Sequence, residues 1–176
     1  MKQNDDMPKH EDIVIRDVEP GDEKVLAYIQ TESWKAAFKD ILSPEDLARY
    51  ADVDKAEQMY KHLLEEKTGN GRILFVGGKP HCIAYWDKSR EEAMMGYAEL
   101  ICIHSLQEQW HKGYGTRMMN YVLNEVRKQG YRNMHLWVFA DNVRARKFYE
   151  SIGFGATAIT KETLGACEIM YSLENL

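Results

Sequence analysis

The sequence predicts an α/β protein in which a mixed, mostly antiparallel sheet of six to seven strands carries helices on both faces. Three observations support this fold class. Hydrophobic residues make up 44% of the 176 residues, which is enough for one sizeable buried core. The first half contains short apolar runs separated by glycine-rich turns, a pattern typical of antiparallel hairpins. The second half alternates apolar strands with helical patterns, and such crossovers join parallel strands.

The first half is expected to contain two helices and an antiparallel meander. Pro20 and Gly21 precede the first helix, because a proline in the first helical turn loses no hydrogen bond. Ser43 stands before a proline and two acidic residues, which is typical of the N-cap of a second helix. Gly77 and Gly78 predict a turn between two strands that pair as a hairpin. The expected strands cover residues 13–16, 72–76, 82–86 and 96–104.

The second half is expected to form two helices between strands. Gly113 opens a helix whose apolar residues recur at helical spacing until Gly130. Asn142 begins another helix, which ends at Gly153. Residues 134–139 form a continuous apolar run, as expected of a strand that is buried on both faces. The closing pair of strands is expected at residues 154–160 and 166–173.

Composition and charge exclude several classes of function. The 28 acidic and 23 basic residues give a net charge of −5, a poor match for the phosphate backbone of nucleic acids. No apolar run approaches the roughly 18 residues of a membrane-spanning helix, and the six histidines lack metal-binding spacing. Cys82, Cys102 and Cys167 lie far apart in apolar runs, as expected of reduced thiols. We therefore expect a cytoplasmic protein with a polar tail at residues 1–12, one domain at 13–176, and no metal, membrane or nucleic-acid partner.

A glycine-bearing loop between a strand and a helix is the first candidate site. Residues 110–116 read WHKGYGT. Glycines let the backbone approach a ligand closely, and the N-terminus of the following helix offers unpaired N–H groups to a pyrophosphate. Taken alone, the loop is more typical of an ordinary glycine turn, since Met118 stands where a dinucleotide fingerprint would have its third glycine.

A second motif follows one strand later, at residues 142–154 with the sequence NVRARKFYESIGF. The two segments in this order closely resemble the GNAT family of N-acetyltransferases. Their hallmarks are a Q/R-x-x-G-x-G/A loop and an N-x-x-A-x-x-F-Y-x-x-x-G-F segment. Residues 110–115 and 142–154 match almost throughout, and the order of strands and helices agrees over residues 13–176. Trp110 departs from the pattern, because the family most often has Gln or Arg there.

The resemblance implies a fold that separates two central strands and holds acetyl-CoA in the gap as cosubstrate. The backbone of one strand would bind the pantetheine arm, the glycine loop would surround the pyrophosphate, and the last helix would contact the arm and the sulfur. The residues carried over for cofactor binding are Ile103, His104, Ser105, Trp110, His111, Lys112, Gly113, Tyr114, Gly115, Thr116, Asn142 and Tyr149. Further positive charge for the phosphates is expected from Lys112, Arg117, Arg144, Arg146 and Lys147.

The implied reaction is direct transfer of the acetyl group to an amine within a ternary complex. A primary amine has a pKa of about 10, so a base must remove its proton near neutral pH. Glu99 precedes Trp110 by eleven residues, the spacing of the base in histone-type members, and is the candidate base. Tyr149 is the candidate proton donor to the departing thiolate. The structural alternatives are a solvent-facing carboxylate for Glu99 and a core ring for Tyr149.

The acceptor amine is not defined by the sequence. Trp34, Phe38, Tyr85 and Trp86 are candidates for an aromatic acceptor pocket, open to a small molecule or a peptide. Homodimers are common in the family, although no interface is evident here. One alternative is a non-catalytic acyl-CoA-binding sensor or interaction protein with the same fold. A nucleotide-dependent oxidoreductase is the other alternative, disfavoured by the missing third glycine.

Overall fold

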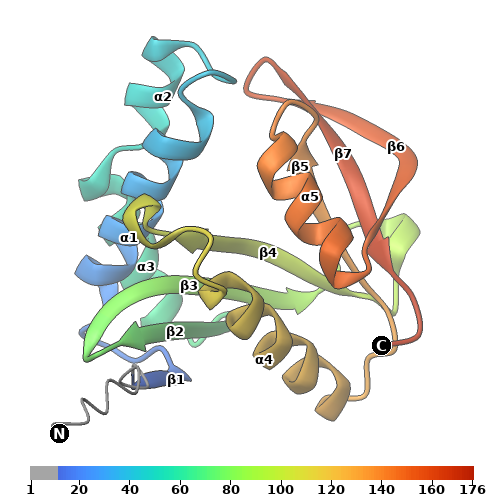
Figure 1. Cartoon of the computed structure of the whole chain (residues 1–176), viewed down its shortest axis with the longest axis horizontal. Helices are drawn as coiled ribbons and strands as arrows, with labels where there is room; N and C mark the ends of the chain where they lie inside the picture. The colour runs from blue at the N-terminus through green and yellow to red at the C-terminus, as the bar shows by residue number, and fades with distance from the viewer. Residues whose placement is uncertain (1–11) are drawn as a thin grey trace, which may run out of the picture.

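The computed structural model describes residues 12–176, so all but the last residue of the predicted polar tail lies outside the described part. A single seven-stranded sheet in the order β1-β2-β3-β4-β5-β7-β6 runs through this part, with helices on both faces (Figure 1). Among the described strands, only β4 and β5 pair in parallel. The predicted mixed, mostly antiparallel sheet is therefore confirmed. The strands are β1 Ile13–Asp17, β2 Asn70–Val76, β3 Lys79–Lys88, β4 Ala98–Ser105, β5 Met134–Phe139, β6 Gly155–Thr163 and β7 Ala166–Leu173.

The helices lie largely where the capping patterns predict them. Ser43 caps α2 by accepting a hydrogen bond from the Asp46 N–H, and Gly153 ends α5 in the left-handed conformation. The helices are α1 Glu23–Phe38, α2 Pro44–Tyr50, α3 Val53–Glu65, α4 Tyr114–Lys128 and α5 Val143–Ile152, with short 3₁₀ turns at Glu92–Met94 and Gln107–Gln109.

One helix, α3, was not predicted. Its N-cap is Asp52, whose carboxylate accepts hydrogen bonds from two N–H groups of the first turn. Ala56, Tyr60 and Leu64 follow at four-residue spacing and are buried together. The cap and this spacing are both visible in the sequence, so the helix could have been recognised there.

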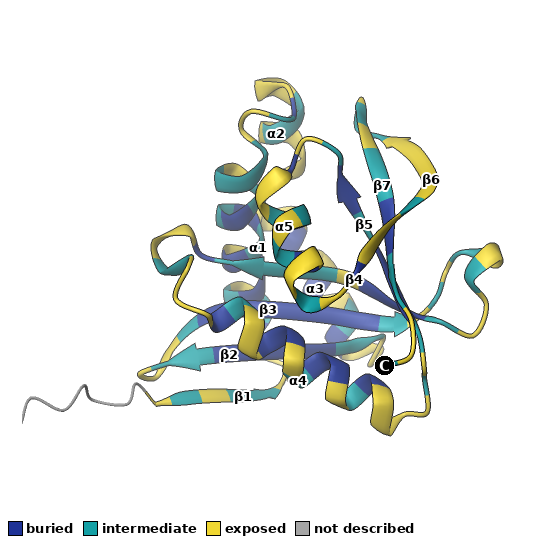
Figure 2. Cartoon of the chain, turned by 45° about the vertical axis from the view of Figure 1, so that its right-hand side comes forward, coloured by how far each residue is buried: buried dark blue, intermediate teal, exposed yellow. Residues whose placement is uncertain are grey.

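The core consists of two clusters, and Figure 2 shows buried residues in helices on both faces of the sheet. The larger cluster lies between the sheet and the helices α4 and α5, and includes Met118, Leu136 and Tyr149. The smaller one lies between the sheet and the helices α1 and α3, and includes Leu26 and Tyr60. No helix among residues 12–176 is long and apolar enough to cross a bilayer.

The feature that positions the site is the separation of β4 from β5. The two strands pair only from Ala98 to Leu100, opposite Met134 to Leu136. Just beyond, the β3–β4 register shifts so that Ile101 has no partner between Leu100 and Cys102. Such a bulge bends the strand and re-aims its side chains. From Ile101 onward, the β4 backbone has no pairing partner on β5.

Candidate active site

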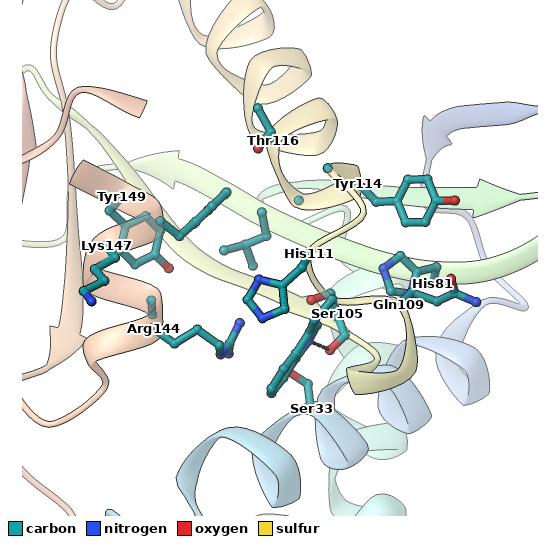
Figure 3. A pocket seen from close by; sticks show the side chains of 16 residues that line it. Ser33, His81, Ser105, Gln109, His111, Tyr114, Thr116, Arg144, Lys147 and Tyr149 are labelled. Atoms are coloured by element: carbon teal, nitrogen blue, oxygen red, sulfur yellow. Dashed lines mark hydrogen bonds between the residues drawn. The ribbon is translucent and has the colours of Figure 1, made fainter. Parts of the chain in front are cut away.

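A cavity of about 450 Å³ opens where β4 and β5 separate. Its walls come from the end of β4, the loop before α4, the first turn of α4, and α5, as Figure 3 shows for the labelled side chains. The lining residues are Ser33, His81, Ile103, Ser105, Gln109, Trp110, His111, Gly113, Tyr114, Gly115, Thr116, Arg144, Ala145, Lys147, Phe148 and Tyr149.

Nine of the twelve residues predicted to bind the cofactor line this cavity, and three do not. Lys112 is exposed and donates a hydrogen bond to the side chain of Gln109 at 2.7 Å. Asn142 caps α5, where its Oδ1 accepts from the Ala145 N–H at 3.2 Å. His104 lies on β4 with its ring toward α1, 6.5 Å from the Trp34 ring centroid. The resemblance gave His104 a role through its backbone only, so its ring orientation does not bear on that role.

The first turn of α4 lacks a side-chain cap. Its N-cap is Gly113 in the left-handed conformation, with φ of 81°, and His111 two residues earlier has φ of 64°. A positive φ is strained for a non-glycine residue. An N-terminal turn without a capping side chain leaves N–H groups and the positive end of the helix dipole directed at the cavity. The arrangement suits an anion such as a pyrophosphate.

Arg144 supplies a fixed positive charge beside this turn. Its guanidinium stacks 3.6 Å from the centroid of the Trp110 ring, and the Trp110 Nε1 donates to the Ser105 carbonyl at 3.0 Å. Burial lowers the pKa of Arg144, which still leaves it charged at neutral pH. Among residues 12–176, Arg144 forms no ion pair with a carboxylate. Trp110 thus stands at the position where Gln or Arg is expected, and it holds the Arg144 guanidinium against the wall of the cavity.

The other predicted basic residues divide into two groups. Lys147 lines the cavity with Arg144. Arg146 points elsewhere, since its guanidinium donates to the Tyr171 hydroxyl and the Ala140 carbonyl, both at 2.9 Å. Arg117 lies beside β1, in a different surface depression. Spacing on a helix could not separate these residues, because all of them occupy the first turns of α4 or α5.

Tyr149 projects from α5 into the cavity, and Figure 3 shows its hydroxyl turned toward the enclosed space. The residue is 8% exposed, and burial raises the pKa of its phenol well above the usual value. The hydroxyl donates to no other residue in the described chain, whereas its ring packs edge-on to Phe154. A protonated phenol with a free hydroxyl is the state that a proton donor requires.

Glu99 lies outside the lining of this cavity, near the paired start of β4. It is only 2% exposed, and its carboxylate accepts hydrogen bonds from the Arg90 N–H at 2.9 Å, from Nε at 3.0 Å and from Nη2 at 2.6 Å. Burial alone would raise the pKa of Glu99, but the hydrogen bonds and charge of Arg90 outweigh it, so that the pKa is lowered. The solvent-facing alternative is thus wrong. The role of Glu99 as a base stays a prediction.

Sequence reasoning missed His81, a cavity residue on β3. It is 3% exposed, its ring meets the Tyr114 ring edge-on, and its Nδ1 has no hydrogen-bond partner within residues 12–176. Burial, reinforced by the charge of Lys112, lowers the pKa of His81 to about 4. The one sequence signal for His81 is a polar residue directly before the apolar run of residues 82–86. No cluster of three or more potential metal ligands exists within the described residues.

The candidate acceptor aromatics separate into two pairs. Trp34 and Phe38 lie together at the end of α1, where the Phe38 ring contacts that of Phe139 on β5 at 5.1 Å between centroids. Tyr85 and Trp86 are buried in the core, on opposite faces of the sheet. Only the first pair stands near the point where β4 and β5 separate.

Comparison with known proteins agrees with this geometry. The profile of the acetyltransferase (GNAT) family matches residues 31–154. A 110-residue segment is 27% identical to an uncharacterised N-acetyltransferase of Methanocaldococcus jannaschii, and covers 60% of this chain and 48% of that protein, so the match spans about half of the relative's length.

Solved structures share the fold at low sequence identity. PaiA N-acetyltransferase of Thermoplasma acidophilum, in complex with coenzyme A, superposes with a TM-score of 0.77 at 18% identity over 93% of this chain and 99% of that one. The Salmonella typhimurium protein YncA, with its cofactor acetyl-CoA, gives 0.69 at 18% identity over 92% and 93%. Because the family profile covers well over half of the chain, the protein belongs to the GNAT family of acetyltransferases.

Proposed function

We propose that this protein transfers the acetyl group of acetyl-CoA to a primary amine of a small molecule or peptide, by direct transfer in a ternary complex. One observation carries the proposal. The uncapped first turn of α4 and the stacked guanidinium of Arg144 face the same cavity, and that cavity reaches the Tyr149 hydroxyl. A site for an anion and a proton donor thus share one cavity, as a phosphate-bearing thioester requires.

The cosubstrate would bind along this cavity in three parts. The first turn of α4, with Gly113 and Gly115, would hold the pyrophosphate, assisted by Arg144. Residues 103–105 of β4 have no β5 partner, so their backbone groups can pair with the amides of the pantetheine arm. Tyr149 would lie beside the sulfur. Coenzyme A and acetyl-CoA bound to the two fold neighbours are consistent with this reading.

In the proposed reaction, the amine nitrogen attacks the thioester carbonyl carbon, the carbon–sulfur bond breaks, and the products are an N-acetylated amine and the thiol. An unpaired N–H of β4 would polarise the carbonyl oxygen. The Tyr149 hydroxyl would donate a proton to the departing sulfur. Glu99 would accept the amine proton through a water, which requires the exposed Arg90 side chain to release part of its hold.

A non-catalytic acyl-CoA-binding protein is the second candidate function. The observation in its favour is the closed Arg90–Glu99 pair, because a carboxylate with three hydrogen bonds is a weak base. Such a protein would bind acetyl-CoA and release no thiol in the presence of amines.

The experiment combines calorimetric titration of acetyl-CoA with thiol release across a panel of amines and peptides. Gly115→Val directs a branched side chain from the first turn of α4, whereas Gly155→Val is the matched control with open space around it. We expect Gly115→Val to weaken acetyl-CoA binding about tenfold or more, and Gly155→Val to leave it unchanged. Unaltered affinity in a folded Gly115→Val protein would contradict the cofactor site. Binding without thiol release from any amine would favour the second candidate.

A further inference from the structure

The face of β5 and β7 that points away from α5 carries a cluster of charged and aromatic side chains. Leu136 and Val138 of β5 belong to the core cluster that contains Tyr149. Because side chains alternate along a strand, Trp137 projects to the opposite face. That face adjoins the point where β4 and β5 separate, since Leu136 is the last residue of β5 that pairs with β4. A group bound against Trp137 would therefore lie across the sheet from the cavity, next to the opening between the strands.

An ammonium group already occupies this position. The Lys161 Nζ lies 4.0 Å from the centroid of the Trp137 ring, and 3.7 Å from a carboxylate oxygen of both Glu91 and Glu168. These residues come from three separate parts of the sequence. Glu91 lies in the loop that follows β3, Trp137 lies on β5, and the pair Lys161 and Glu168 lies in the β6–β7 hairpin. An aromatic face flanked by carboxylates is the environment that proteins use to bind alkylammonium ions.

Both carboxylates are held in place by other groups. The Trp137 Nε1 donates to Glu91 Oε1 at 3.0 Å, and the Thr163 hydroxyl donates to Glu168 Oε2 at 2.7 Å. The Lys161 Nζ, by contrast, makes no hydrogen bond within the described residues, and the Lys161 side chain is 40% exposed. A half-exposed ion pair at this distance contributes little to stability. The site is thus fixed on its anionic side and loosely filled on its cationic side.

The charge balance of this cluster favours a cationic ligand. Two carboxylates face one ammonium, since Glu99 nearby is already paired with Arg90. Beneath the same face, the fully buried ring of His135 accepts or donates one hydrogen bond, with Ser89, and its Nδ1 has no partner among the described residues. A positively charged ligand group would therefore be attracted to the carboxylates of Glu91 and Glu168.

We propose that Trp137, Glu91 and Glu168 form a subsite for a second, non-reacting ammonium group of the acceptor, and that Lys161 fills this subsite in the free protein. The inference rests on the proposed acetyl transfer and names its substrate class, a linear diamine or a longer polycation. The reacting amine itself must lose its proton before attack. The subsite therefore binds the distal charge, and leaves the near nitrogen free to approach the opening between β4 and β5.

The test measures binding separately from turnover. Linear diamines from 1,3-diaminopropane to 1,6-diaminohexane, and monoamines of equal length, are titrated calorimetrically into the protein saturated with coenzyme A. We expect at least one diamine to bind about fivefold or more tightly than its monoamine, since one ion pair on an aromatic face adds about that much. Lys161→Met should strengthen diamine binding, because the internal competitor is removed.

Glu168→Gln should abolish the diamine preference, and Glu162→Gln is the matched control on the same hairpin. Glu162 is exposed and pairs across the hairpin with Cys167 instead. Equal binding of diamine and monoamine by the unaltered protein, or a preference that survives in Glu168→Gln, would overturn the subsite. Melting temperatures of all variants show whether each is folded. Diamine preference without any acetylation would support the subsite and refute the proposed acetyl transfer. Acetylation of amines without that preference would support the acetyl transfer and refute the subsite.

Discussion

Replacing Arg144 by glutamine tests the anion site most directly. The substitution keeps the aliphatic stem of the side chain and removes the guanidinium that stacks on the Trp110 ring. Arg144 has no carboxylate partner in the described chain, so its loss leaves no buried acid unpaired. Stability should therefore change little, and the effect should be confined to binding.

The magnitude follows from the state of the guanidinium. Burial already lowers the pKa of Arg144, so part of its desolvation cost is present before any ligand binds. A hydrogen bond to a charged group contributes about 1.5–3 kcal/mol, which corresponds to about 10- to 150-fold in Kd. The interaction joins two charges, so it should also weaken with increasing salt.

The assay compares two ligands. Acetyl-CoA carries the phosphates, and acetyl-pantetheine carries the same thioester without them. Arg144→Gln should weaken acetyl-CoA binding by the stated factor and leave acetyl-pantetheine binding unchanged. Arg132→Gln, at an exposed position outside the cavity, is the charge-matched control. Equal losses for both ligands, or no loss for acetyl-CoA, would refute the assignment of Arg144 to a phosphate.

Four further predictions concern catalysis and pH. Tyr149→Phe should lower kcat about 10- to 10³-fold with acetyl-CoA affinity nearly unchanged; a lower melting temperature with full turnover would identify a packing residue. Glu99→Gln should lower kcat/KM about 10²-fold near neutral pH and less in alkali, and Arg90→Gln should move the acidic limb of the pH profile upward, because it removes the contacts that depress the pKa of Glu99. Burial lowers the pKa of His81 and His104 to about 4. Between about pH 4 and the pKa of about 6.5 in the unfolded chain, the unfolded chain therefore binds more protons than the folded one. The melting temperature should therefore fall as the pH drops through this window, and fall less in His81→Asn; an equal fall would exclude His81 as a source.

The order of strands and helices could be predicted because local signals and tertiary packing agree along most of the chain. Ser43, Gly113 and Gly153 end or begin helices where their backbone preferences require it. The separation of β4 from β5 could not be predicted from pattern alone. It depends on an unpaired residue, Ile101, whose neighbours in sequence read as a continuous strand. The resemblance to a known family supplied that feature.

The backbone of the candidate site was easier to predict than the interaction partners of its side chains. The glycine loop and the Asn142 segment define which backbone groups meet, since turn and cap geometry are local. Side-chain partners depend on elements that come together only in the fold. Arg90 reaches Glu99 from a loop nine residues earlier, and Lys161 reaches Trp137 across an intervening strand.

The Arg90–Glu99 and Lys161–Trp137 pairs lie on the same face of the sheet and share one arrangement. Each joins a cation with a large exposed fraction to a better-fixed anion or ring, as Arg90 is 65% exposed beside a Glu99 side chain that is 2% exposed. A mobile cation on a fixed anion is the arrangement that a charged ligand can displace, since the fixed partner needs no reorganisation when the exchange occurs. Binding of a cationic acceptor would release Lys161 by direct competition. If the positive charge of the acceptor also weakens the ion pair between Arg90 and Glu99, binding of the acceptor beside Trp137 releases the Glu99 carboxylate at the same time. Loss of the Lys161 ammonium should then alter the pH profile of Arg90-containing enzyme but not that of Arg90→Gln, and identical shifts in both backgrounds would separate the two pairs.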